Sequence, residues 1–287
     1  MRRPLLALGA LTLLAGCGAL ELGTANVLEL GGGGYRRELD LSYGAHAAQR
    51  LDVYVPQGAA QAPRPLVVFV HGGRWRTGTK ADYRFVAAGL AERGIVVVVP
   101  NYRLYPEVRM PAAVADVAAA VAWAEHEAPR YGADPAALVV MGHSAGAQLA
   151  ALVATDRHWL ADAGAAPVRA LVGLAGPYDF LPLKDADLID YFAPPAAYPA
   201  SQPVNFVDAT SAPALLVHGL ADTTAKPRNS ESFAAHLRAA GVAVELHLMP
   251  GEDHGAVLKR FARPFRGSDP LYADVVRFLT SPPRRGS

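Results

Sequence analysis

Continuous apolar runs that alternate with stretches of helical pattern constrain the fold of this 287-residue chain more than any other feature. Such uninterrupted runs are typical of strands buried on both faces of a parallel sheet. They cover residues 66–70, 95–99, 138–141, 170–174 and 215–217, and the helical stretches cover residues 83–93, 111–128, 145–155, 226–240 and 271–279. The alternation predicts an α/β fold with a mostly parallel, doubly wound sheet.

Two segments at the start and one near the middle depart from this rhythm. Residues 38–43 and 50–55 alternate apolar and polar side chains, which is the period of half-buried strands near a sheet edge and predicts an antiparallel start. Residues 178–211 carry five prolines among aromatic residues. An insertion of this kind inside a compact domain is usually functional or mobile, so we expect a short lid, rather than a second domain, within one domain over residues 37–287.

Charge and cysteine content exclude several kinds of partner and site. The formal net charge of +1, without a block of like charges, gives no electrostatic footprint for nucleic acid. The one cysteine excludes an intramolecular disulfide and a multi-cysteine zinc site. A phosphate-binding glycine loop, a dinucleotide fingerprint and a zinc-protease motif are not found in the sequence. We therefore expect no nucleic acid partner, no metal and no cofactor.

The amino terminus has the pattern of an export signal. Two arginines precede about ten apolar residues, a stretch too short to span a bilayer. Leu14-Ala15-Gly16-Cys17 resembles the bacterial lipobox, in which the cysteine becomes the lipidated first residue of the mature protein. We predict a signal peptide over residues 1–16, lipidation of Cys17, a Gly-rich tether over residues 17–36, and a lipid-anchored location in the bacterial cell envelope. The alternative is an ordinary cleaved signal that contains a cysteine.

A G-x-S-x-G motif stands between a predicted strand and a predicted helix. In Gly142-His143-Ser144-Ala145-Gly146, the small flanking residues permit the sharp turn that projects a serine hydroxyl from the top of the sheet. Ser144 is the predicted nucleophile. The alternative, a serine that only caps the helix, does not require the two glycines.

A nucleophilic serine needs a base, and the base needs a carboxylate that orients it. His254 lies in a polar loop directly after the alternating run over residues 242–248, which makes it the predicted base. Asp222 lies just beyond the strand over residues 215–217 and is the favoured acid. Asp179 follows the preceding strand and is the competitor, although it could instead cap a helix in the lid.

The turn after the first buried run offers backbone donors. Gly72 and Gly73 end that run, and glycine backbone lets N–H groups point at a developing negative charge. Together with the amide of Ala145, they form the predicted oxyanion hole, and the sequence leaves open which N–H groups along Gly72-Gly73-Arg74 make the bond. The neighbouring His71 is expected to brace the loop through hydrogen bonds.

Residues 51–279 resemble an α/β-hydrolase of the esterase and lipase group. The matching motifs are His71-Gly72-Gly73, Asn101 to Glu107, Gly142 to Gly146, Asp222 and His254, and the step from Gly73 to Arg74-Trp75 is similar to the feruloyl-esterase-like and kynurenine-formamidase-like branch. The resemblance implies hydrolysis of small to medium carboxylic esters through a serine acyl-enzyme. Two alternatives remain: an arylformamidase or other amide hydrolase with the same triad, and a non-catalytic envelope lipoprotein.

Several side chains near the predicted site have open roles. Trp75, Tyr178 and Phe180 are candidates for lining a substrate pocket, although aromatic residues are more often simply packed. Arg74 and Arg76 flank the oxyanion loop. They could attract an anionic substrate, but solvated or ion-paired arginines are the favoured interpretation.

Overall fold

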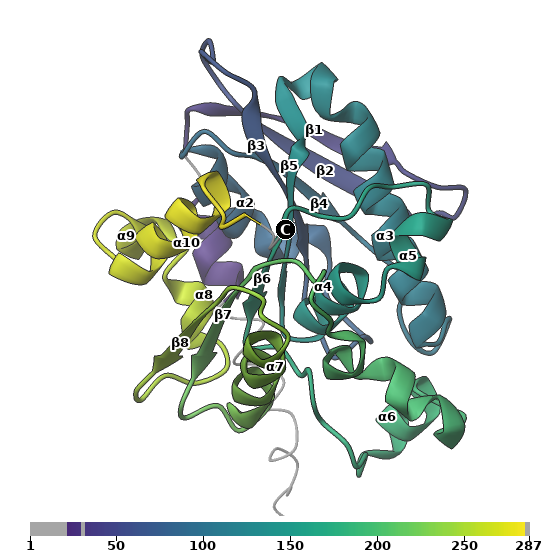
Figure 1. The fold of residues 1–287 in the computed structure, drawn as a ribbon. Coiled ribbons are helices and arrows are strands. Elements are labelled where there is room, and N and C mark those ends of the chain that lie inside the picture. The colour runs from purple at the N-terminus through teal and green to yellow at the C-terminus, as the bar shows by residue number, and fades with distance from the viewer. Residues whose placement is uncertain (1–21, 30–31, 285–287) are drawn as a thin grey trace, which may run out of the picture.

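The computed structural model describes residues 22–29 and 32–284, and these form an eight-stranded sheet with helices on both faces (Figure 1). The strand order is β1-β2-β4-β3-β5-β6-β7-β8. β2 pairs antiparallel with β1 and β4, and the remaining neighbours are parallel. The strands are β1 (Tyr35–Ser42), β2 (Arg50–Pro56), β3 (Arg64–Val70), β4 (Val96–Pro100), β5 (Ala133–His143), β6 (Ala170–Leu174), β7 (Ala214–Gly219) and β8 (Val244–Met249). The predicted doubly wound sheet with an antiparallel start is confirmed.

Both faces of the central strands are covered, which explains why their sequences are apolar without alternation. Val68 and Val70 of β3 belong to one apolar cluster, and Val67 and Phe69 belong to another. The first cluster is completed by α3 (Met110–Glu127), α4 (Ala145–Thr155), α5 (His158–Asp162) and α7 (Arg228–Ala239). The second is completed by α2 (Arg84–Ala91), α8 (Ala256–Lys259) and α10 (Pro270–Thr280). Each side chain along such a strand is therefore buried against a helix layer.

Short helical turns connect the main elements. They are η1 (Lys80–Tyr83), η2 (Ala128–Tyr131) and α9 (Arg263–Arg266). The segment that we call the lid, residues 178–211, contains α6 (Ala186–Tyr191), η3 (Pro195–Ser201) and η4 (Pro203–Phe206). Its aromatic side chains pack on Trp75, with ring centroids 5.5 Å away for Tyr191 and 5.1 Å away for Phe192. The lid is thus packed against the loop that follows β3.

The segment before β1 differs from the Gly-rich tether that we expected over residues 17–36. Residues 22–28 form a short helix, drawn in purple in Figure 1 beside α2 and the yellow carboxyl-terminal helices. The Asn26 amide donates to the backbone oxygens of Ala81 (3.0 Å) and Asp82 (2.9 Å). Glu29 forms a buried ion pair with Arg266 at 2.6 Å. These contacts fix residues 26–29 to the body, and β1 already begins at Tyr35. The predicted signal peptide and Cys17 lie outside the described residues.

Candidate active site

Ser144 occupies a sharp turn between β5 and α4. Its backbone has φ 54° and ψ −123°, a conformation that L-residues rarely adopt and that concentrates at functional sites. The turn is possible because the motif glycines lack side chains. A Cβ on Gly142 would lie 2.4 Å from the Gly146 oxygen, and a Cβ on Gly146 would lie 2.2 Å from the Val70 oxygen. The sequence therefore forces the serine hydroxyl outward at the carboxyl end of the sheet.

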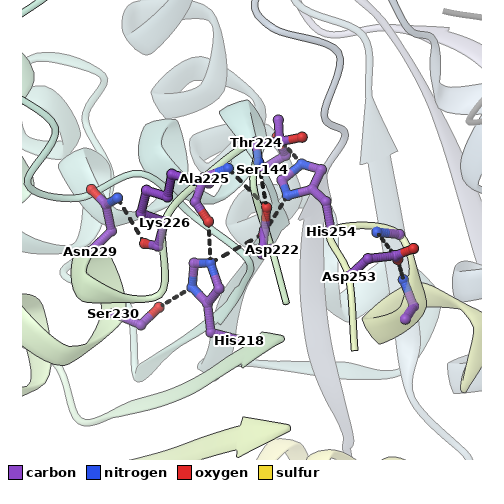
Figure 2. Close-up of polar contacts among 12 residues, drawn as sticks. Ser144, His218, Asp222, Thr224, Ala225, Lys226, Asn229, Ser230, Asp253 and His254 are labelled. Atoms are coloured by element: carbon purple, nitrogen blue, oxygen red, sulfur yellow. Dashed lines mark hydrogen bonds and ion pairs between the residues drawn. The ribbon is translucent and has the colours of Figure 1, made fainter. Parts of the chain in front are cut away.

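Three side chains from distant parts of the chain form a hydrogen-bonded line at this edge (Figure 2). His254 Nε2 lies 2.8 Å from Ser144 Oγ, and His254 Nδ1 lies 2.7 Å from Asp222 Oδ2. Asp222 follows β7 and His254 follows β8, so the parallel register of these strands places both loops beside Ser144. The line has the geometry in which an imidazole accepts the serine proton while a carboxylate orients the ring.

The Asp222 carboxylate is buried but fully engaged. Its Oδ1 accepts from the backbone amides of Thr224 (2.8 Å) and Ala225 (3.0 Å). Burial alone would raise the pKa of Asp222, but hydrogen bonds from His218 and His254 outweigh it and hold this pKa well below its usual range. The group is therefore an ionised acceptor throughout the neutral pH range. Asp179, the competing acid, instead accepts from Ser232 Oγ at 2.6 Å.

Sequence reasoning missed the role of a second histidine at the same carboxylate. His218 is fully buried at the end of β7, and its Nε2 lies 3.2 Å from Asp222 Oδ2 and 2.7 Å from the Ala225 oxygen. Because a carbonyl oxygen only accepts, Nε2 carries the proton, and Nδ1 accepts from Ser230 Oγ at 2.7 Å. The sequence signal that could have indicated this contact is the spacing of four residues between His218, in β7, and Asp222, just beyond its end.

The predicted oxyanion donors differ in whether they already have a hydrogen-bond acceptor. The Gly72 amide donates to Tyr83 Oη at 3.2 Å. This N–H already has an acceptor, whereas the sequence predicted that it would donate to the oxyanion. No described residue accepts a hydrogen bond from the Gly73 or Ala145 amide. The chain has φ +127° at Gly73 and φ +53° at Arg74, so the loop that carries these donors has an unusual backbone conformation.

Two buried histidines hold the loops around the site. His71 Nδ1 donates to the Gly72 oxygen at 2.8 Å, and its ring stacks on Tyr102 at 4.5 Å, in agreement with the expected bracing. His143, the variable residue of the motif, packs against the His254 ring at 5.0 Å, with its Nε2 3.3 Å from the His254 oxygen. Burial lowers the pKa of His71 to about 4 and that of His143 to about 3, so both rings are neutral at pH 7.

A pocket of about 320 Å³ opens beside Ser144. The candidates Trp75 and Phe180 line it, and Trp75 Nε1 is fixed by a hydrogen bond to Gln148 Oε1 at 3.1 Å. Tyr178 does not line it: this side chain is fully buried and stacks on Phe233 at 4.8 Å. Tyr178 therefore packs the base of the lid rather than contacting a ligand.

Arg74 and Arg76, in the loop after β3, are ion-paired with the lid. Arg74 lies 2.8 Å from Asp185, and Arg76 contacts Asp187. Both pairs are exposed, which agrees with the favoured sequence interpretation. They join the loop after β3 to the lid across a sequence separation of 111 residues.

Known proteins share this architecture. The esterase of Pyrobaculum calidifontis is 26% identical with a TM-score of 0.74, and the match covers 91% of this chain and 90% of that one. A truncated carbohydrate esterase from gut microbiota is 24% identical with a TM-score of 0.74, covering 86% of this chain and 96% of that one. The similarity to the carbohydrate esterase supports a shared fold only.

Curated relatives are longer than this chain. Esterase LipC of Mycobacterium tuberculosis is 31% identical over 242 residues, which are 77% of this chain and 60% of LipC. Isoprenylcysteine alpha-carbonyl methylesterase ICME of Arabidopsis thaliana is 28% identical over 83% of this chain and 60% of that protein. The chain thus spans about 60% of the length of the curated relatives that it matches.

Two sequence models match separate parts of the chain. Residues 1–17, which end at Cys17, match the prokaryotic membrane lipoprotein lipid attachment site, which indicates a lipid-anchored envelope protein. None of the helices in the described part of the chain combines the length and apolar character needed to cross a bilayer. Residues 51–237 match the BD-FAE model, and the chain belongs to the BD-FAE family.

Proposed function

We propose that this protein is a serine carboxylesterase in which Ser144 is the nucleophile, His254 the general base and Asp222 the orienting acid. The observation that carries the proposal is the line of hydrogen bonds from Ser144 to His254 (2.8 Å) and from His254 to Asp222 (2.7 Å). The rare backbone conformation of Ser144 supports it, because such strain persists where function requires it. The named esterases among the relatives and the P. calidifontis structure support the ester class.

The reaction follows from the positions of these groups. His254 Nε2 accepts the hydroxyl proton as Ser144 Oγ attacks the ester carbonyl, and Asp222 stabilises the resulting imidazolium. The Gly73 and Ala145 amides donate to the oxyanion of the tetrahedral intermediate. Collapse breaks the bond to the alcohol oxygen, which takes the proton from His254. A water molecule, deprotonated by the same imidazole, then releases the acid and regenerates Ser144.

Pocket size supports small to medium substrates. A volume of about 320 Å³ is at the lower end of small-molecule sites, and the lid packs directly over Trp75 at its wall. A short acyl chain or a single aromatic ring fits such a space better than a long lipid chain. The lipid that we assign to Cys17 would therefore be an anchor and not a substrate. It would hold the protein on the outer side of the cytoplasmic membrane or at the outer membrane.

Hydrolysis of chromogenic short-chain esters by the purified protein tests the proposal. The parent should hydrolyse 4-nitrophenyl butyrate, and Ser144→Ala should lower kcat by about 10³ or more. Ser232→Ala is a matched control, because Ser232 bonds to Asp179 rather than to the line of catalytic groups. Hydrolysis by Ser144→Ala at the parent's rate would refute the assignment of the nucleophile. Turnover of N-formylkynurenine in place of the ester would move the substrate class to amides.

A further inference from the structure

The pocket beside Ser144 carries an excess of positive charge. Four cationic side chains line it, and one carboxylate, Asp185, does so as well. Asp185 is paired with Arg74 at 2.8 Å. In residues 22–29 and 32–284, no carboxylate lies within ion-pair distance of the other three cations, which are Lys184, Lys226 and Arg228. Figure 2 shows Lys226 on the loop that leads from Asp222 to α7.

The acidic residues of the lid, all of which the structure describes, form no ion pair with these three cations. Asp179 accepts from Ser232 Oγ at 2.6 Å, and Asp187 contacts Arg76. Asp190 lies 2.7 Å from Arg109. Four of the five lid carboxylates are therefore paired with arginines, and Asp179, whose hydroxyl partner leaves its charge in place, offsets at most one of the three cations.

Two helix amino termini add to the same potential. Ala145 is the first residue of α4 and Arg228 is the first residue of the 12-residue α7, and both line the pocket. Helix amino termini carry partial positive charge and favour anions. The lining also has an apolar part, which includes Phe180, Leu183 and Leu188. A lining that combines apolar and cationic side chains fits an amphipathic ligand that carries a negative group away from the reacting ester.

We propose that the pocket selects esters that carry a second, ionised carboxylate, and that Lys184, Lys226 and Arg228 bind this carboxylate while Ser144 attacks the ester. The inference rests on the proposed esterase function and adds the substrate class. In the overall step, the acyl carbon–oxygen bond of the monoester breaks and water supplies the new oxygen. The alcohol leaves with one proton, and the product is a dicarboxylate plus the second proton.

Matched pairs of substrates test the proposal. The monoethyl esters of succinate, glutarate, adipate and suberate carry the carboxylate at increasing distances, and their terminal carboxamides are neutral counterparts of the same shape. At the best chain length, kcat/KM followed in a pH-stat should favour the carboxylate over the carboxamide by about tenfold, because exposed charge pairs each contribute about two- to fivefold. The preference should shrink between about 0.05 M and about 0.5 M NaCl, because salt screens exposed charges.

Variants separate the three cations from general charge effects. The triple variant Lys184→Gln, Lys226→Gln, Arg228→Gln should lose the preference for the carboxylate. Arg238→Gln should keep it, because Arg238 is exposed near the other end of α7, about 15 Å along the helix axis from Arg228. Equal kcat/KM for both members of every pair in the parent, or an undiminished preference in the triple variant, would overturn the inference.

Binding of the dicarboxylates themselves gives a readout that needs no turnover. In calorimetric titrations, the best-fitting dicarboxylate should bind the parent about tenfold more tightly than the triple variant. Equal binding to both proteins would overturn the inference even if both esters are hydrolysed. Failure of the parent to hydrolyse any ester, with the difference in dicarboxylate binding intact, would count instead against the proposed esterase function.

Discussion

The buried imidazole of His71 should make the stability of the fold depend on pH. Its side chain is fully buried, its Nδ1 donates to the Gly72 oxygen, and no described residue bonds to Nε2. Burial lowers the pKa from 6.5 to about 4. The unfolded chain therefore binds this proton more readily than the folded chain does. Because one pKa unit corresponds to about 1.36 kcal/mol, the difference amounts to about 3 kcal/mol.

The sign of the effect follows from the depressed folded-state pKa. The contribution of His71 to the free energy of unfolding is fully present above about pH 6.5 and is lost as the pH falls toward about 4. Replacing His71 with Phe keeps a ring that can stack on Tyr102 and removes the titrating group. As the pH falls across this range, the free energy of unfolding of the variant should therefore decrease by about 3 kcal/mol less than that of the parent. This holds even if the variant is less stable at pH 7.

Urea denaturation at several pH values between about 7 and about 4 measures this difference. His236→Gln provides a matched control, because it removes an exposed imidazole from α7 and should leave the parent's pH dependence in place. Parallel loss of stability in the parent and in His71→Phe would refute the argument, since it would mean that the folded chain protonates His71 as readily as the unfolded chain.

Three further substitutions test other parts of the account. Asp222→Asn should lower kcat by about 10³ to 10⁴ with little change in KM, because an amide no longer holds the base in the right tautomer; steady-state kinetics measure this. Glu29→Ala should lower the free energy of unfolding by about 3 kcal/mol in urea titrations, because it leaves buried Arg266 with only part of its counter-charge. Gly146→Ala should abolish hydrolysis and lower Tm, because the added Cβ would lie 2.2 Å from a backbone oxygen. An unchanged kcat in Asp222→Asn, an unchanged free energy of unfolding in Glu29→Ala, or unchanged hydrolysis and Tm in Gly146→Ala would contradict the role given to that residue.

Patterns within one element predicted the fold well. The apolar run over residues 170–174 matches β6, because both faces of this strand are buried and its side chains need no alternation. The G-x-S-x-G motif predicted a strand, a sharp turn and a helix, and these are β5, Ser144 and α4. Local sequence carries this information because steric limits at Gly142 and Gly146 act within the turn itself.

Several contacts between segments that are distant in the sequence could not be predicted from it. Nothing near Gly72 in the sequence shows that Tyr83, in the η1 turn that follows the oxyanion loop, occupies its amide. The shared carboxylate of His218 and His254 depends on the register of β7 and β8. The docking of residues 26–29 depends on Arg266, which lies 237 residues from Glu29. The glycine content of this segment predicted a tether. It could not reveal the buried ion pair between Glu29 and Arg266 that holds the segment to the body.

Covalent labelling tests the central claim, that Ser144 is a nucleophile activated by His254, most directly. A fluorophosphonate should form one adduct per chain, and mass spectrometry of the digested protein should place it on Ser144. His254→Ala should slow this labelling by about 10³, because the hydroxyl then lacks the base that lies 2.8 Å away. An adduct on another residue, or equal labelling rates for the parent and His254→Ala, would contradict the account.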